Sequence, residues 1–217
     1  IATARLGDVV LRSAFQLVYM VRGRLLEAVA AEGFLRPERE GVPVPPADYL
    51  AALDEAERER AVNVADVLHE RNRRHVGVCP LTHVVGLDGL AAHLLDGAAP
   101  GAIWRVRRPL LVGRSDLALI DAARRERGVR LAFSGVGFDQ AVLERVREIV
   151  PDIVGFDGAW FRRVSASEGA RHLLARLVEA LKEIGAMVLV PGIETQAQLL
   201  AAIEAGADLF QGFALSR

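Results

Sequence analysis

The sequence of 217 residues has one cysteine, Cys79, and only one lysine, Lys182, among its 27 basic residues. A single cysteine excludes an intrachain disulfide and a cysteine-based metal site, and it favours a reducing compartment, so we expect a cytoplasmic domain. No apolar run reaches the length of a membrane span, and no signal peptide is recognisable. The formal charge of −1 at pH 7 argues against binding to a nucleic-acid polymer or a membrane surface.

Catalytic constellations are scarce as well. The five histidines share no ligand spacing, and no Ser/His/Asp or Cys/His set stands at the predicted strand ends. The segment Ser134–Gly137 resembles a phosphate-cradling loop, but a glycine pattern this short is not specific. The sequence begins at Ile1 rather than at a methionine, so we expect it to be part of a larger protein with further domains.

Apolar residues, in contrast, make up 52% of the sequence, and segments with strand and helix patterns alternate regularly. Residues 14–34 have the pattern of an antiparallel hairpin that turns at Arg22-Gly23, and six or seven strand–helix pairs follow. Such alternation is typical of parallel α/β folds. We predict a closed barrel over residues 14–217, with a doubly wound sheet as the alternative, and a lead-in helix or linker at residues 1–13.

The boundaries of the other elements follow from periodicity, capping residues and glycines. Predicted strands cover residues 75–81, 103–108, 129–133, 153–156, 187–190 and 208–215. Predicted helices cover residues 47–73, 89–95, 115–127, 139–149, 165–185 and 195–205.

The last of these helices has the clearest pattern. Thr195 and Gln198 have the spacing of a capping box, and Gly206 stands where a left-handed residue ends a helix. The predicted inward stripe consists of Leu199, Leu200 and Ile203. Two polar residues flank this helix: Glu194 just past the preceding strand and Gln211 inside the following one. Ligands of parallel α/β folds bind at the carboxyl ends of strands, so both are candidate site residues.

The stretches GIET (192–195) and QGFALSR (211–217) resemble the end of an EAL domain, the bacterial cyclic di-GMP phosphodiesterase module. Phe15-Gln16 resembles the opening FQP of that family, and Glu32–Arg36 resembles the EALLR motif that names it. Pro46 and Tyr49 fall where the family has a proline and an aromatic residue. The resemblance extends from Phe15 onward, and it implies a TIM-like (β/α)8 barrel of EAL type that opens with an antiparallel hairpin.

The resemblance also implies a site for two Mg²⁺ or Mn²⁺ ions, which lower the pKa of an attacking water. Such ions need several oxygen ligands. The asparagine ligand of the family falls at Pro80, a glutamate at Arg105, and paired aspartates at Ser134 and Gly135. The lysine of the family falls at Gly155, and the first glutamate of its EGVET stretch at Pro191. We therefore predict no metal site, no cofactor and no metal-dependent phosphodiesterase activity.

For the residues that remain, the resemblance implies a ligand-binding set at the barrel mouth. The candidate residues are Gln16, Glu32, Arg36, Arg105, Arg108, Asp157, Glu194 and Gln211. Arg105 and Arg108 replace lost cations and hold a phosphate, if they face the pocket. The favoured alternative is that one arginine pairs with a surviving carboxylate such as Glu32 or Asp157 and plugs the old site. For Asp157 and Glu194 the alternative is helix capping or loop bracing, and for Gln211 it is a core hydrogen bond.

The sequence thus predicts a catalytically inactive EAL-like signalling domain in bacterial second-messenger regulation. It would act by binding a protein partner, such as other domains of a larger signalling protein, or cyclic di-GMP. The alternative is an active metal-dependent phosphodiesterase that hydrolyses one phosphodiester bond of cyclic di-GMP.

Overall fold

A computed structural model describes residues 1–72, 75–77, 79–84, 101, 103–106 and 109–215. The predicted helix at residues 89–95 and the candidate Arg108 lie outside these ranges. The strands are β1 (Ala4–Leu6), β2 (Val9–Arg22), β3 (Leu25–Arg39), β4 (Val42–Pro43), β5 (Cys79–Val84), β6 (Ile103–Val106), β7 (Arg130–Val136), β8 (Ile153–Phe156), β9 (Met187–Val190) and β10 (Leu209–Phe210). The helices are α1 (Pro46–Ala51), α2 (Glu55–Asn72), α4 (Arg114–Arg127), α5 (Gln140–Ile149), α6 (Gly158–Ser165), α7 (Glu168–Glu183) and α8 (Gln196–Glu204), with short 3₁₀ turns η3 (Pro109–Leu111) and η4 (Phe213–Leu215).

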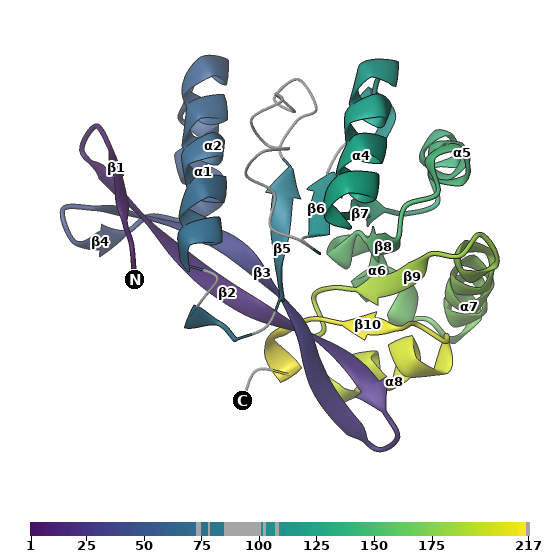
Figure 1. The fold of residues 1–217 in the computed structure, drawn as a ribbon. Helices are drawn as coiled ribbons and strands as arrows, with labels where there is room; N and C mark the ends of the chain where they lie inside the picture. The colour runs from purple at the N-terminus through teal and green to yellow at the C-terminus, as the bar shows by residue number, and fades with distance from the viewer. Residues whose placement is uncertain (73–74, 78, 85–100, 102, 107–108, 216–217) are drawn as a thin grey trace.

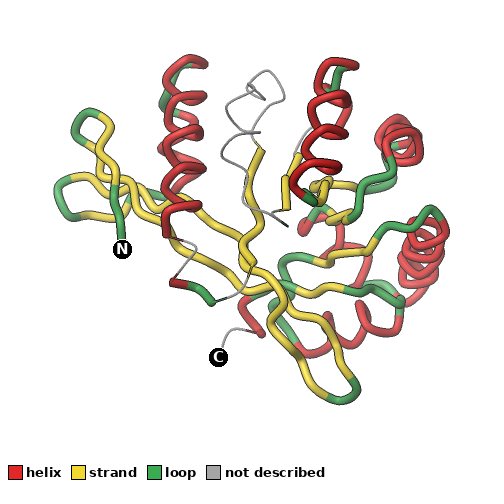
Figure 2. Tube along the Cα trace, in the orientation of Figure 1, coloured by secondary structure: helices red, strands yellow, loops and turns green. Residues whose placement is uncertain are grey.

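Eight of the described strands form a closed ring. From β3 the ring runs through β5, β6, β7, β8, β9 and β10, and every neighbouring pair in that series is parallel. Strand β2 closes it by pairing antiparallel with both β10 and β3. Helices lie around the outside of the strands (Figure 1), as the tube view also shows (Figure 2). The predicted barrel with an opening antiparallel hairpin is confirmed.

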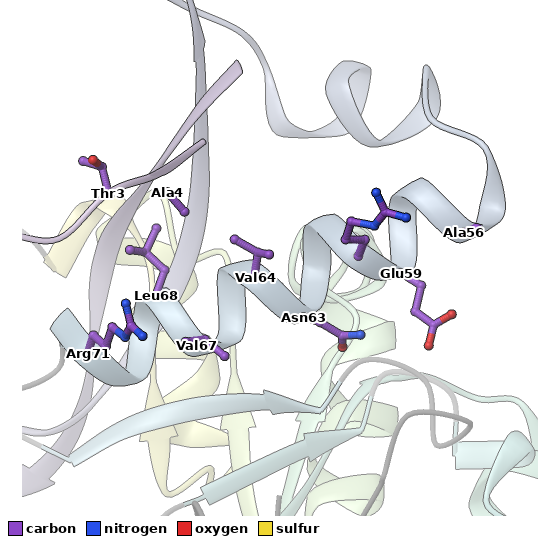
Figure 3. A pocket seen from close by; sticks show the side chains of 10 residues that line it. Thr3, Ala4, Ala56, Glu59, Asn63, Val64, Val67, Leu68 and Arg71 are labelled. Carbon is purple, nitrogen blue, oxygen red and sulfur yellow. The ribbon is translucent and has the colours of Figure 1, made fainter. Parts of the chain in front are cut away.

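The hairpin starts earlier than the sequence suggested. Its turn lies at Gly23, where φ is +63°, a conformation that glycine adopts without steric cost. Residues 1–13 are not a helix, because β1 and the start of β2 pair antiparallel there. Val9 and Leu11 are 2% and 0% exposed, which is the two-residue period of a strand with one buried face. A groove of about 540 Å³ lies between the start of the chain at β1 and one side of α2 (Figure 3).

The predicted helix over residues 47–73 is two helices. Asp54 accepts a hydrogen bond from the backbone N–H of Glu57 at 2.8 Å, and the Glu57 carboxylate accepts one from the N–H of Asp54 at 3.2 Å. This reciprocal pair is a capping box, and it starts α2 after a break. The D-x-x-E spacing in the sequence was the pattern that could have predicted the break.

The predicted helix over residues 165–185 is α7, which begins a few residues later, and an additional helix, α6, precedes it. Asp157 caps the earlier helix α6 by accepting a hydrogen bond from the backbone N–H of Trp160 at 2.6 Å. Ser165 is the last residue of α6 rather than a cap, and α7 begins after Ser167. The apolar spacing of Phe161 and Val164 behind an aspartate fits this arrangement.

At the C-terminal end, the capping box of Thr195 and Gln198 is confirmed. Gly206 has φ of +84°, as expected for the residue after a helix end. The predicted inward stripe is largely wrong, because Leu200 and Ile203 are 50% and 38% exposed. The buried face of α8 carries alanines instead, at positions 201 and 202. The predicted strand 208–215 is also too long, because the ladder of β10 ends at Phe210.

Alternation along the strands divides the core into two layers. Trp104, Val154 and Val188 belong to a large apolar cluster with residues of the surrounding helices. Their neighbours Ile103, Ile153 and Leu189 belong to a second, smaller cluster. Because successive side chains of a strand point to opposite faces, the second cluster lines the barrel lumen. None of the described helices has the length and apolar character needed to cross a membrane.

Candidate functional site at the barrel mouth

A cavity of about 400 Å³ opens where the parallel strands end. Five of the predicted site residues line it: Gln16, Glu32, Arg105, Asp157 and Gln211. The rest of its described wall consists of Phe34, Ser134, Gly135, Phe156, Gly158, Pro191 and Gly192. The cavity therefore stands at the end of the barrel where ligands of this architecture bind.

Glu32 is the centre of this wall. It lies on β3, directly opposite Gln16 of β2, and it is only 2% exposed. The guanidinium Nη1 of Arg105 forms an ion pair with its Oε1 atom. Nε2 of Gln211 donates a hydrogen bond of 3.0 Å to its Oε2 atom. Three segments far apart in the sequence thus converge on one buried carboxylate, and both of its oxygens are engaged.

The strand period explains why Arg105 reaches this carboxylate. Arg105 is two residues beyond Ile103, so both side chains face the lumen, whereas Trp104 and Val106 face the helices and are 3% exposed. The side chain of Arg105 is 17% exposed. Of the two roles weighed for it, pairing with Glu32 is the one seen. A charge buried to this degree needs such a partner.

The arrangement does not fit a pair of divalent cations. A metal ion bound by Glu32 would have to displace the guanidinium of Arg105 or lie beside it. Two positive charges next to one carboxylate repel each other strongly. Among the described residues, no group of three or more histidine, cysteine, aspartate or glutamate side chains has the placement to hold a metal ion. The arrangement can offer hydrogen-bond donors to an anionic ligand, among them the guanidinium of Arg105, whose charge Glu32 balances.

The wall beside Arg105 is built from β7. The predicted glycine-rich turn at Ser134–Gly137 is partly strand, because β7 continues to Val136 across a bulge in its pairing with β8. Gly135 has φ of +74°, which accommodates the bulge. The hydroxyl of Ser134 donates a hydrogen bond of 3.4 Å to the carbonyl of Val106. These small residues leave the cavity open next to the guanidinium.

Of the roles weighed for Asp157, helix capping is the one seen. Its carboxylate caps α6, as described above, and it also lines the cavity. Glu194 is exposed and lies outside the lining set, with its Oε1 atom 3.7 Å from Nη1 of Arg162. This contact agrees with the bracing alternative for Glu194.

Arg36 also lies outside the lining set. It is exposed on β3, donates a hydrogen bond of 3.2 Å to the carbonyl of Leu35, and has its guanidinium carbon 5.9 Å from the centre of the Phe34 ring. Because Phe34 lines the cavity, Arg36 stands next to its rim.

Two aromatic residues of the wall were missed by sequence reasoning. Phe34 follows Glu32 by two residues on the same strand and so shares its face, a relationship that the sequence contained. Phe156 was assigned only to a strand, but it also lines the cavity and packs on Trp160 with ring centres 5.0 Å apart. Phe138 also packs on Trp160, edge to face, with ring centres 5.3 Å apart.

Comparison with known proteins agrees with this geometry. The family model of the EAL domain matches residues 114–217. The EAL domain of FimX from Pseudomonas aeruginosa, solved bound to c-di-GMP, superposes with a TM-score of 0.78 at 21% identity over 95% of this chain and 90% of that one. The phosphodiesterase PaMucR, solved as a c-di-GMP complex, has a TM-score of 0.78 at 16% identity over 95% and 91% of the two chains.

A third structure is the Bacillus subtilis YkuI protein, which has an EAL domain and was solved with its substrate c-di-GMP and calcium. It gives a TM-score of 0.76 at 17% identity over 97% of this chain and 55% of that one. No curated protein matches the sequence. Barrel, hairpin and mouth cavity define the class as a TIM-like barrel with its site at the carboxyl ends of the strands. Residues 114–217 match the family model of the EAL domain, and the chain as a whole shares the fold of solved EAL domains.

Proposed function

We propose that this EAL domain acts in bacterial cyclic di-GMP signalling by binding the dinucleotide at its barrel mouth without hydrolysing it. Two of the similar structures, FimX and PaMucR, are described as holding c-di-GMP. The mouth cavity of about 400 Å³ stands at the end of the barrel expected for such a ligand.

One observation carries the non-hydrolysing part of the proposal. The guanidinium of Arg105 pairs with the carboxylate of Glu32, the acidic residue of the EALLR-like motif. Hydrolysis by the mechanism implied by the family needs ions that activate a water, and those ions need several oxygen ligands around Glu32. Where the resemblance expects such ligands, the wall has Ser134, Gly135 and Pro191, none of which has a carboxylate. Asp157 also lines the cavity, but its carboxylate caps α6.

The same features support retention of an anionic ligand. A guanidinium suits phosphate because its donors lie in one plane and match two oxygens at once. Arg105 faces the cavity while it remains paired to Glu32, and the exposed Arg36 stands beside the rim. Phe34, which is partly exposed, adds aromatic surface to the same wall, which suits a purine.

Calorimetry with cyclic di-GMP tests this proposal. We expect binding of equal affinity in magnesium, in manganese and in excess EDTA, because no ion takes part. Arg105→Gln should weaken binding by about tenfold, which corresponds to one charged hydrogen bond. The matched control is Arg176→Gln, which changes an exposed arginine on α7. Binding that requires a divalent ion would contradict the proposal.

The second candidate is a module that binds a protein partner through the same end of the barrel. The observation that favours it is Phe138, which is 48% exposed beyond the end of β7 and held edge to face against Trp160. Absence of any calorimetric response to the dinucleotide, from protein shown to be folded, would favour this candidate over the first.

A further inference from the structure

A second cavity, of about 210 Å³, lies inside the barrel beneath the mouth. It shares only Arg105 and Ser134 with the mouth cavity, so these two residues lie between the spaces. Its wall is the apolar cluster of the lumen: Val18, Ala30, Ile103, Ala132, Ile153, Leu189 and Leu209. All seven of these are at most 5% exposed.

An open lumen departs from the usual construction of such barrels. Layers of bulky branched side chains normally fill the interior completely, and protein interiors hold few voids larger than a water molecule. Here two of the inward positions carry alanine, Ala30 on β3 and Ala132 on β7. The missing side-chain volume leaves a space with an apolar lining, which water does not fill favourably.

The opposite rim of this cavity has a different character. Arg130 and Met187 are the first residues of β7 and β9, so this rim lies at the amino ends of the parallel strands. Met20 and Arg22 of β2 belong to the same rim. Met20 and Met187 are the only methionines of the chain. Methionine side chains are flexible and adapt to varied apolar ligands.

The two arginines of the rim differ in their partners. Arg22 pairs with Glu27 at 2.9 Å. Arg130 is exposed, and within the described part of the chain its side chain has no hydrogen-bond or ion-pair partner. An apolar space thus ends at a cation that no carboxylate of the described residues compensates. This combination matches a ligand with an apolar tail and one anionic head.

We propose that the barrel lumen binds a small anionic amphiphile, a straight-chain carboxylate of about eight carbons, with its tail among Ala30 and Ala132 and its carboxylate at Arg130. The length follows from volume, since an engineered apolar cavity of about 150 Å³ holds the six carbons of benzene. The ligand enters from the end of the barrel opposite the mouth, so its site is separate from that of the dinucleotide.

A chain-length series tests the apolar part. Butyrate, hexanoate and octanoate are titrated into the protein and binding is followed by calorimetry. Each added methylene that enters the lumen should tighten binding by about fourfold, because burying one CH₂ is worth about 0.8 kcal/mol. An affinity that does not rise with chain length, or no binding of octanoate at all, would overturn the proposal.

Variants locate the site. Ala132→Leu places a larger side chain in the lumen and should weaken octanoate binding by about tenfold or more, and Ala30→Val is a second filler if the first does not fold. Arg130→Gln should weaken the binding of octanoate by about two- to fivefold, the scale of an exposed ion pair. The binding of octanol, which has the same tail but no charge, should stay unchanged. Arg125→Gln, an exposed arginine on α4, is the matched control.

Dinucleotide binding is measured on every variant as a second readout. It should be unchanged by the two fillers, since they act beneath Arg105. Octanoate that binds a folded filler variant as tightly as the original protein would show that the lumen is not the site.

Discussion

The guanidinium of Arg105 on β6 pairs with the buried carboxylate of Glu32 on β3, reaching past the intervening strand β5. Gln211, which follows β10, completes the set from the other side of the mouth. The pair compensates the charge of the motif glutamate from within the protein. The mouth of this barrel is therefore held together by its own side chains.

Removal of the cation should be costly. Arg105→Met leaves the carboxylate of Glu32 buried without its ionic partner, and we expect a loss of about 3 kcal/mol in the free energy of unfolding, measured with urea. The double variant Arg105→Met with Glu32→Gln should recover most of that loss, because no buried charge remains. A double variant as unstable as the single one would contradict the pairing.

Gln211 should matter for stability as well. Gln211→Leu removes the hydrogen bond to Oε2 of Glu32, and a bond to a charged group is worth about 1.5–3 kcal/mol. The control is Gln140→Leu, which removes an exposed bond to Glu144 and should change the unfolding free energy by less than about 0.5 kcal/mol. Equal effects of the two substitutions would remove Gln211 from the mouth network.

The two roles of Asp157 can be separated by substitution. Asp157→Ala removes the cap of α6 and should cost about 1 kcal/mol in unfolding free energy. Asp157→Asn keeps a good capping side chain but loses the charge, so stability should stay nearly unchanged. If Asp157 also contacts the dinucleotide, calorimetry with the asparagine variant will show weaker binding. Unchanged affinity in that variant would limit Asp157 to capping.

Gly33 and His69 form a coupled pair behind the mouth. A Cβ atom added to Gly33 would lie 2.6 Å from Cγ of His69, and that ring is held by a 2.8 Å hydrogen bond between Nδ1 and Oγ of Ser13. Gly33→Ala should therefore destabilise the fold by about 2 kcal/mol, as overpacking does. In the background His69→Ala the same substitution should cost much less. Equal costs in both backgrounds, measured by urea unfolding, would contradict the clash.

The environment of Tyr49 predicts how the free energy of unfolding changes at alkaline pH. Burial raises the pKa of its phenol above the ordinary value of 10.0, and the carboxylates of Asp8 and Glu57 add to the shift against the opposing Arg39. A group whose pKa is higher in the folded state stabilises the fold below pH 10 and loses that contribution as the pH rises through the folded value. Tyr49→Phe should lessen the fall in unfolding free energy between pH 9 and pH 11, as measured with urea.

The sequence predicted the barrel because strand and helix periods alternate clearly from the hairpin onward. It also predicted the cap at Thr195, where the relevant residues are three positions apart. The wrong predictions concern element boundaries that tertiary packing determines. The break before α2 and the extra helix α6 both begin at an aspartate within an apolar pattern, which a reading of periodicity alone passed over. The short β10 ends level with Val190, the last residue of its parallel partner β9, and local sequence does not carry that information.

Part of the candidate site could also be predicted from the sequence. The strand period predicts that Arg105 and Ile103 face the same way, and the resemblance identified Glu32 as a site residue. The ion pair between Arg105 and Glu32 was therefore one of the two outcomes that the sequence allowed. The bond from Gln211 to Glu32 joins residues 179 positions apart, and only the closed ring brings them together. The lumen cavity was not foreseen, because two alanines in separate strands have no common pattern in the sequence.

The most direct measurement of the central claim is a turnover assay. Purified protein is incubated with cyclic di-GMP and millimolar magnesium or manganese, and the products are separated by chromatography. Because the guanidinium of Arg105 occupies the carboxylate of Glu32, we predict no conversion above that of buffer alone. Linear dinucleotide that accumulates in proportion to protein concentration, and that does not form when EDTA is present from the start, would contradict the account.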